Sequence, residues 1–300
     1  MPKAKSQEQS LICIRIWGGL ANQMFQYAAG FSTAQRLGCE LLMDPVASGA
    51  DHATYGLDLF GLKTRFWNPD PPKTLLSSLK GRFRSERKNT KKRYTRWPGA
   101  HFSQKSFCTG EGFEQIEAGT YMQGYFQSED FFANHQIQIR EIFSLAHLQA
   151  DIDPSLRVLA TRPNSVSVHI RRGDYATNPK TTKVHGLLPL SYYSRALSVM
   201  QKMHGELPVL VFSDDIETAD ALTENWPNRT LIRNQSREQD LYLMSKCANH
   251  IIGNSSFSWW GAWLNPDLDK TVIAPRRWFS REEMRKTYVD DLYPQGWLLV

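Results

Sequence analysis

The second half of the chain alternates short apolar segments with helical ones, and this alternation restricts the fold more than any other feature. Five apolar runs have the length of buried strands: residues 165–171, 208–213, 229–233, 249–253 and 271–275. Helical spacing lies between them, at 191–204, 216–224, 237–248 and 257–264. Strands that alternate with helices form right-handed βαβ units, so we expect an α/β fold with a parallel sheet.

The first half begins with the same kind of unit. The run LICIRIW, residues 11–17, predicts a buried strand, and GGLANQ then turns the chain into a helix that stops at Gly38. The aromatic stretch from Gly119 to Phe132 predicts another strand and a helix start. A chain of 300 residues exceeds one ordinary core, and prolines near residue 154 indicate a boundary. We therefore expect two domains, 1–156 and 157–300.

Polar clusters follow three of the predicted strands in the second half. The strand ends deliver His169 with Arg171, Arg172 and Asp174; then Ser213 with Asp214 and Asp215; then Asn254 with Ser255 and Ser256. The carboxyl ends of parallel strands share one edge of the sheet, and ligands bind at that edge. We expect the three clusters to converge there.

These residue types suit a ligand that carries phosphate. Arginine offers a planar fork of donors to phosphate oxygens and keeps its charge at ordinary pH. Free N–H groups at a helix start also bind phosphate, and a carboxylate can accept hydrogen bonds from a base or a ribose. Neighbouring buried cations are costly without an anion, so Arg171 and Arg172 favour this interpretation most strongly. The clusters together predict a pocket for a nucleoside diphosphate.

Each cluster alone also has a structural interpretation. Asn254 and Ser255 can cap a helix, Asp214 and Asp215 can be cap or turn residues, and His169 can be a core histidine. The sequence contains neither a G-x-G-x-x-G fingerprint after a strand nor a Walker lysine loop. No His, Asp or Glu cluster has the spacing of metal ligands, so we expect no bound metal.

Four motifs together resemble one enzyme family. HIRRGDY, VFSDD, GNSSFSWWGAWL and the early GGLANQMFQYA are similar to the α-1,2-fucosyltransferases of glycosyltransferase family 11, and they occur in family order over residues 18–264. The His-x-Arg-Arg-x-Asp element also resembles that of α-1,6- and protein O-fucosyltransferases. The resemblance implies a GT-B architecture: two Rossmann-like domains with the active site in the cleft between them, an N-terminal acceptor-side domain and a C-terminal domain that binds GDP-fucose.

The resemblance also implies a reaction and roles for residues. Inverting transfer would move L-fucose from GDP-fucose to the 2-hydroxyl of a terminal galactose, a hexosyltransferase reaction without a cofactor or an essential metal. Arg171 would bind the β-phosphate, and Arg172 would support it or hold the loop through a carboxylate. Asn22 would reach the donor phosphates or the acceptor hydroxyl. The general base would be Asp174 or His185. The residues that would bind the donor are His169, Arg172, Asp214, Asp215, Asn254, Ser255, Ser256 and Phe257.

The net charge of +6 comes from one segment. Residues 80–97 contain nine lysines and arginines against one glutamate, and they form no recognisable nucleic-acid module. The segment is either a solvated loop or a docking patch for an anionic membrane surface or a phosphate-bearing acceptor. In the membrane interpretation, the patch Lys80–Arg96 would face the inner membrane. With no signal peptide, no apolar stretch of about 20 residues and four unpaired cysteines, we expect a cytoplasmic or peripheral protein.

We therefore expect a bacterial enzyme of surface polysaccharide synthesis that acts on a glycan acceptor, lipid-linked in this setting. The partners would be GDP-fucose and a galactose-terminated glycan, without nucleic acid. Two alternatives stay open: transfer of another GDP-sugar, and a non-catalytic protein that binds nucleotides or polyanions. A donor assay would separate them.

Overall fold

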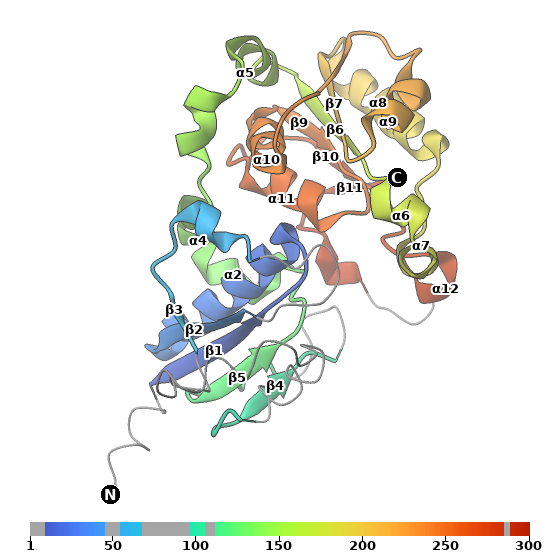
Figure 1. Ribbon diagram of the computed structural model, residues 1–300. Helices are drawn as coiled ribbons and strands as arrows, with labels where there is room; N and C mark the ends of the chain where they lie inside the picture. The colour runs from blue at the N-terminus through green and yellow to red at the C-terminus, as the bar shows by residue number, and fades with distance from the viewer. Residues whose placement is uncertain (1–9, 46–54, 68–95, 106–111, 285–288) are drawn as a thin grey trace, which may run out of the picture. The chain divides into compact units, whose positions relative to one another are not determined.

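A computed structural model describes residues 10–45, 55–67, 96–105, 112–284 and 289–300 (Figure 1). The chain divides into two compact units, Met1–Ile142 and Phe143–Val300. The boundary that we expected after residue 156 falls inside a helix of the second unit, α5 (Pro154–Ala160). Basic residues 80–95 lie outside the described part of the chain.

The first unit contains a parallel sheet whose five described strands run in the order β3-β2-β1-β5-β4. Its elements are β1 (Leu11–Ile16), α2 (Leu20–Leu37), β2 (Glu40–Pro45), η1 (Leu57–Phe60), β3 (Arg65–Phe66), β4 (His101–Ser103), β5 (Thr120–Gln123), η3 (Glu129–His135) and α4 (Gln136–Ile142). The predicted strand–turn–helix of the GGLANQ region is confirmed, and α2 ends at Gly38 in the left-handed conformation, with φ 64°. The stretch after Gly119 forms β5, followed by the 3-10 helix η3.

Aromatic side chains fill one face of this first sheet. Trp97 is buried against Tyr121 and Trp67, and its indole N–H donates to the carbonyl of Gly119 at 2.8 Å. The Tyr121 hydroxyl donates to the buried carboxylate of Asp44 at 2.6 Å. Trp97, which ends the basic segment, is therefore a core residue of this unit.

The second unit contains a parallel sheet whose six described strands run in the order β11-β10-β9-β6-β7-β8. Its elements are η4 (Ala146–Asp151), α5, β6 (Val166–Ile170), α6 (Gly173–Thr177), α7 (Pro179–His185), α8 (Leu190–His204), β7 (Val209–Ser213), α9 (Ile216–Thr223), β8 (Arg229–Leu231), α10 (Arg237–Lys246), β9 (Asn249–Ile251), α11 (Ser256–Leu264), β10 (Val272–Ala274), α12 (Arg281–Met284), η5 (Asp290–Leu292) and β11 (Leu298–Leu299). All five strands and all four helices predicted for this half are confirmed.

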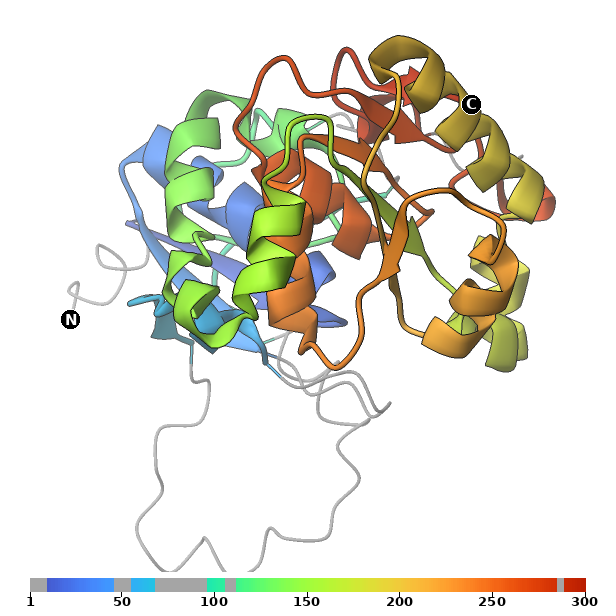
Figure 2. The same cartoon turned by 90° about the horizontal axis from the view of Figure 1, so that it is seen from above.

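Helices cover both faces of this second sheet (Figures 1 and 2). α8 and α9 pack on one face, where Tyr193, Met200 and Ala219 join the core of β6 and β7. α10 and α11 lie on the other face and pack against each other. The two parallel α/β units confirm the predicted α/β class with two Rossmann-like halves.

The strand order places a switch point beside β6. From β6 the chain adds β7 and then β8 on one side, and it returns to place β9 on the other side of β6. Ligands of open α/β sheets bind outside the carboxyl ends of the strands where the order reverses. The ends of β6 and β9 are therefore where this rule predicts that a ligand binds.

Two further observations concern membrane-spanning helices and cysteines. Within the described residues, no helix is both long and apolar enough to cross a membrane. Cys13, Cys39 and Cys247 are free thiols.

Candidate functional site

The structure brings the three polar clusters of the second unit together at the switch point. The Ser213 hydroxyl donates to the carbonyl of Ile170 at 2.6 Å and so ties the end of β7 to the end of β6. The Tyr175 hydroxyl donates to the carbonyl of Asn254 at 3.2 Å and so ties the loop after β6 to the loop after β9. We call this set of strand ends the switch-point site.

Arg171 lies at the centre of the switch-point site, held by two carboxylates. Its Nη2 donates to Asp174 Oδ1 at 2.5 Å, and its Nη1 lies 3.0 Å from Asp214 Oδ2. The guanidinium carbon lies 5.3 Å from the centre of the Tyr175 ring. Its Nε is buried without a hydrogen-bond partner in the structure, so one donor of a rigidly held cation is unused.

Asp214 connects both arginines of the predicted pair. Besides the ion pair with Arg171, its Oδ1 accepts a hydrogen bond from the backbone N–H of Arg172 at 2.8 Å. Gly173 makes this approach sterically feasible, because a Cβ at that position would lie 2.1 Å from Asp214 Oδ2. The carboxylate thus occupies the space that any other side chain at position 173 would need.

Arg172 points away from Arg171. It is buried, and its Nη1 donates to the carbonyl of Leu188 at 3.0 Å. The segment between α7 and α8 is therefore held by this guanidinium through a carbonyl. Of the two neighbouring arginines, Arg171 therefore lies at the switch-point site, whereas Arg172 holds the loop between α7 and α8 in place.

The two histidines of the site are both neutral at pH 7. Burial, and then the charge of Arg171, lower the pKa of His169 to about 3. Burial also lowers the pKa of His185 to about 4, although the charge of Asp174 opposes this shift. The His185 ring stacks on Tyr175 with centres 4.6 Å apart, and the Nδ1 atoms of both histidines are buried without a partner in the structure. Each ring therefore has an unused nitrogen.

The loop after β9 leads into a helix start that has no side-chain cap, and we call it the open start of α11. Ser255 is the N-cap residue of α11 and makes no capping bond with its side chain. The first amides of a helix have no acceptor within it, and with the helix dipole they attract anions. Ser256 begins α11, and the Phe257 ring lies 5.8 Å from that of His169. The open helix start therefore borders the residues around Arg171.

Two other predicted residues have their polar groups engaged by the protein. Asn254 Nδ2 donates to three carbonyls, those of His185, Gly186 and Trp278, at 3.1, 3.4 and 3.1 Å. Asp215 caps α9 by accepting from the backbone N–H and the hydroxyl of Thr218, and these bonds lower its pKa. Both residues thus support loops at the edge of the site.

Asn22 belongs to the first unit, in the first turn of α2. Its Oδ1 accepts a hydrogen bond from Gln127 Nε2 at 2.8 Å. The neighbouring glutamines hold the loop before α2: Gln23 Nε2 donates to Gly18 O, and Gln26 Oε1 accepts from Trp17 N. The motif GGLANQMFQ therefore fixes its own strand-to-helix turn and orients Asn22.

Sequence reasoning missed two contributors to the switch-point site. Tyr175 provides a ring to both Arg171 and His185, and its hydroxyl joins two loops. The signal was present, because Tyr175 ends the quoted motif HIRRGDY. Tyr193 lies in α8 with its buried hydroxyl close to the backbone of Arg171, and no motif in the sequence reveals it. Among the described residues, no group of three or more His, Cys, Asp or Glu side chains could hold a metal ion.

A fixed guanidinium beside a helix start, at the switch point of a parallel sheet, is typical of α/β proteins that bind nucleotides. The family is narrower: residues 82–300 match glycosyltransferase family 11, and the chain belongs to this family. The predicted family is confirmed, and the protein is a glycosyltransferase.

Several relatives are similar over most of the chain. The O-antigen biosynthesis glycosyltransferase WbnK of Escherichia coli is 35% identical over 296 residues, which cover 91% of this chain and 96% of the relative. An α-1,2-colitosyltransferase of Escherichia coli is 33% identical over 298 residues, 97% of this chain and 99% of the relative. A galactoside 2-α-L-fucosyltransferase, SEC1 of Bos taurus, is 28% identical over 158 residues, 49% of this chain and 43% of the relative.

The solved structures with a similar backbone fold have lower sequence identity to this chain. The α-1,6-fucosyltransferase NodZ co-crystallised with GDP has a TM-score of 0.47 and 16% identity, with 86% of this chain and 93% of that chain covered. The heptosyltransferase WaaC of Escherichia coli has a TM-score of 0.47 and 9% identity, with 97% and 92% covered.

Proposed function

We propose that the protein transfers L-fucose from GDP-fucose to the 2-hydroxyl of a terminal galactose, with inversion at the fucose C1. The observation that carries this proposal is the Arg171 guanidinium, held at the switch point of the sheet beside the open start of α11. Family membership supplies the reaction class, and the bovine relative supplies the galactoside and the linkage.

The proposed reaction requires the protein to stabilise negative charge on the leaving group, GDP. The bond from fucose C1 to the β-phosphate oxygen breaks, and the acceptor 2-oxygen bonds to C1 from the opposite face of the ring. Both bonding electrons leave with GDP, so negative charge develops on the diphosphate. Arg171 and the amides of Ser256 and Phe257 would face that charge, and fixed donors at a developing anion are a major source of catalysis. Ser255 and His169 would line the same pocket.

The proton of the acceptor hydroxyl needs a destination. Asp174 is paired with Arg171, so its carboxylate holds the guanidinium in place. His185 is neutral and has an unused Nδ1, which makes it the second candidate base, although a pKa of about 4 makes it a weak one. Asn22 would orient the acceptor hydroxyl through its amide. If C1–O cleavage precedes attack, the hydroxyl is acidified by the cationic sugar and a weak base suffices.

A second donor deserves a direct comparison, because one relative at 33% identity is an α-1,2-colitosyltransferase. Colitose is fucose without its 3-hydroxyl, so both donors present the same diphosphate to the switch-point site. If the protein hydrogen-bonds the 3-hydroxyl of fucose, it would discriminate against colitose, because the protein group that binds this hydroxyl would then have no partner.

The cellular setting that fits these relatives is the synthesis of a bacterial surface polysaccharide, since one of them acts in O-antigen biosynthesis. The acceptor would then be a lipid-linked glycan at the cytoplasmic face of the inner membrane. The basic residues 80–96 would attract the anionic lipids, and their charge reversal should weaken binding to anionic vesicles.

One experiment tests the proposed function. Purified protein is given radiolabelled GDP-fucose or GDP-colitose with an array of galactosides, in EDTA, and the product linkage is determined by NMR. We expect an α-1,2-fucosyl galactoside without added metal. If only GDP-colitose supports transfer, the donor in the proposed function is GDP-colitose and not GDP-fucose. If the protein binds GDP but transfers no sugar from either donor, it is a nucleotide-binding protein without this activity.

A further inference from the structure

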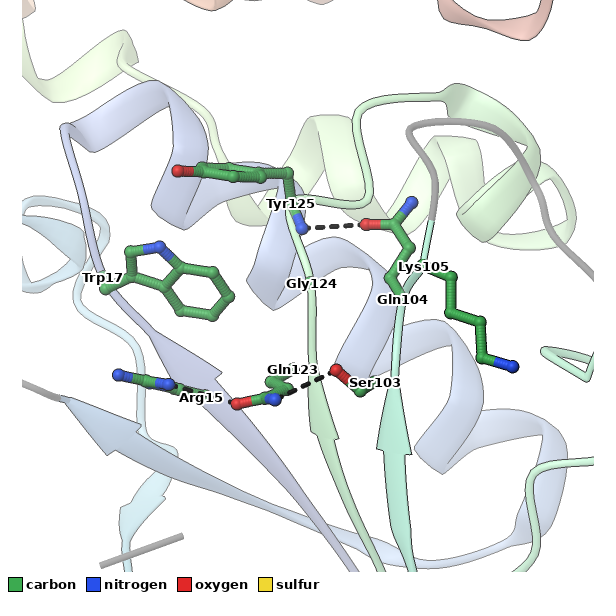
Figure 3. Close-up of a pocket in the computed structure, with 8 residues that line it drawn as sticks. All are labelled: Arg15, Trp17, Ser103, Gln104, Lys105, Gln123, Gly124 and Tyr125. Carbon is green, nitrogen blue, oxygen red and sulfur yellow. Dashed lines mark hydrogen bonds between the residues drawn. The ribbon is translucent and has the colours of Figure 1, made fainter. Parts of the chain in front are cut away.

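The first unit has a pocket of its own at the carboxyl ends of its strands, of about 310 Å³ (Figure 3). Its walls come from the ends of β1, β5 and β4. The lining residues are Arg15, Trp17, Ser103, Gln104, Lys105, Gln123, Gly124 and Tyr125. This set contains two cations, three polar side chains and two aromatic rings, and no carboxylate.

Two of the lining side chains, Trp17 and Tyr125, are aromatic rings that do not belong to the buried core of the unit. Trp17 and Tyr125 lie with ring centres 5.5 Å apart at an angle of 55°, and Tyr125 is 39% exposed. Exposed aromatic pairs that are fixed in place provide contact area at little entropic cost. Tilted rings leave an apolar surface open toward the pocket, and the C–H groups on one face of a pyranose ring match such a surface.

The backbone that presents Tyr125 is held rigidly. Gln104 Oε1 accepts from the N–H groups of both Tyr125 and Phe126, at 2.8 and 2.9 Å. Phe126 has a φ of 52°, rare for a side chain of its size, and its buried ring packs among Phe102, Phe113 and Phe131. Core packing thus imposes a strained backbone next to an exposed ring, which is common at binding sites.

The floor of the pocket is a row of polar side chains connected by hydrogen bonds. Ser103 pairs in register with Gln123, which lies next to Arg15 on β1. Arg15 Nη1 donates to Gln123 Oε1 at 3.1 Å, and Gln123 Nε2 donates to Ser103 Oγ at 3.0 Å. The Arg15 guanidinium also lies 5.1 Å from the centre of the Trp17 ring, and its buried Nε has no hydrogen-bond partner in the structure. Oriented amide and guanidinium groups suit the hydroxyls of a sugar.

The pocket borders the segments that orient Asn22. Trp17 directly precedes Gly18, and a Cβ on Gly18 would lie 3.3 Å from Asn22 Nδ2. Gln127, two residues after Tyr125, donates to Asn22 Oδ1. The same two segments therefore carry the aromatic pair and the amide that we assign to the acceptor hydroxyl.

We infer that this pocket is the acceptor subsite, in which a pyranose ring of the glycan stacks on Trp17 and Tyr125 while its hydroxyls bond to Arg15 and Gln123. This inference rests on the proposed function for the identity of the glycan as acceptor. The pocket, and not the switch-point site, then selects the acceptor.

The test measures acceptor kinetics and direct glycan binding in the same variants. Trp17→Ala and Tyr125→Ala should raise the KM for lactose about fivefold to tenfold, with the dissociation constant for GDP unchanged. Trp17→Tyr and Tyr125→Phe keep a ring and should restore most of the affinity. Ile137→Ala removes a side chain that is 73% exposed in the same unit and serves as the matched control.

Saturation-transfer NMR detects lactose binding without turnover. It therefore tests the acceptor pocket separately from the proposed transfer of fucose. If GDP-fucose is not a donor, but lactose binds the wild type and not Trp17→Ala, the proposed function fails while the pocket stands. If transfer from GDP-fucose proceeds and both alanine variants, folded by circular dichroism, keep the wild-type KM and lactose signal, the pocket assignment is overturned.

Discussion

Arg171 and Asp214 form an ion pair across the ends of the neighbouring strands β6 and β7, with 3.0 Å between Nη1 and Oδ2. A second carboxylate, Asp174, holds the other terminal nitrogen of the same guanidinium. The cation is therefore oriented before any ligand arrives, and such preorganisation avoids reorganisation during the reaction. The two carboxylates also limit how tightly the ground state of an anionic ligand can bind.

The first prediction concerns the role of Asp214. Asp214→Asn keeps an acceptor for the Arg172 N–H but removes the ion pair that orients Arg171. We expect kcat to fall on the order of 10-fold to 100-fold, with GDP binding unchanged or tighter because a nearby negative charge is gone. Isothermal titration with GDP and initial-rate kinetics measure both. If Asp214 instead reads the guanine or the ribose, GDP affinity will fall at least as much as kcat.

The second prediction concerns the steric fit at Gly173. A Cβ there would overlap Asp214 Oδ2, so Gly173→Ala should displace this carboxylate and lower transfer about as much as Asp214→Ala does. Because both changes act through one contact, the double variant should be little worse than either single variant. Additive losses in this double-mutant cycle would show that the two positions act independently.

The third prediction concerns stability of the first unit. Tyr121→Phe removes the hydroxyl that donates to the buried Asp44 carboxylate, and should lower the free energy of unfolding by about 1–3 kcal/mol. Urea unfolding measures the loss. Tyr55→Phe is the matched control, since the Tyr55 hydroxyl donates to the Met43 sulfur, a weak acceptor, at 3.8 Å. If the two substitutions lower the free energy of unfolding equally, the hydrogen bond from Tyr121 to Asp44 contributes no more than that from Tyr55 to the Met43 sulfur.

The fourth prediction concerns pH and the buried His250. Asn265 Nδ2 donates to its Nε2, so the ring is neutral and its Nδ1–H donates to Ser167 Oγ. Burial, and then the charge of Lys270, lower the pKa of His250 to about 3 from 6.5. The unfolded chain then takes up the proton first, so this contribution to stability is complete above pH 6.5 and is lost as the pH falls toward 3.

The measurement is urea unfolding at several pH values between 7 and 4. In wild-type protein the contribution of His250 declines by up to about 1.4 kcal/mol per pH unit, and His250→Gln should lose that part of the pH dependence. His147→Gln, at an exposed position, controls for the loss of a histidine as such. Identical pH dependence in His250→Gln and wild type would contradict the assignment.

Much of the second unit could be predicted because the physical rules for parallel sheets act locally. Apolar runs the length of a strand, such as 165–171, have helical spacing on both sides, and the carboxyl ends of parallel strands must share an edge. The convergence of Arg171, Asp214 and Asn254 follows from that geometry alone. The family motifs lie at those strand ends and were recognisable for the same reason.

The partners of these residues could not be predicted, because they depend on side-chain directions in space. Asp214 and Asp215 are neighbours in sequence, yet one binds two arginines and the other caps α9. Arg172 reaches a carbonyl where a carboxylate was one expectation. Trp17 and Tyr125 are far apart in the sequence, and only the pairing of β1 with β5 brings them together.

The most direct test of the account replaces Arg171. Arg171→Lys keeps a positive charge but loses the fork that can hold two carboxylates and still face a phosphate, and Arg171→Ala removes the charge. We expect kcat/KM for transfer from GDP-fucose to fall at least about 100-fold in both variants, with unchanged circular dichroism. Transfer within tenfold of the wild-type rate by folded Arg171→Ala would contradict the central claim that this guanidinium stabilises the departing GDP.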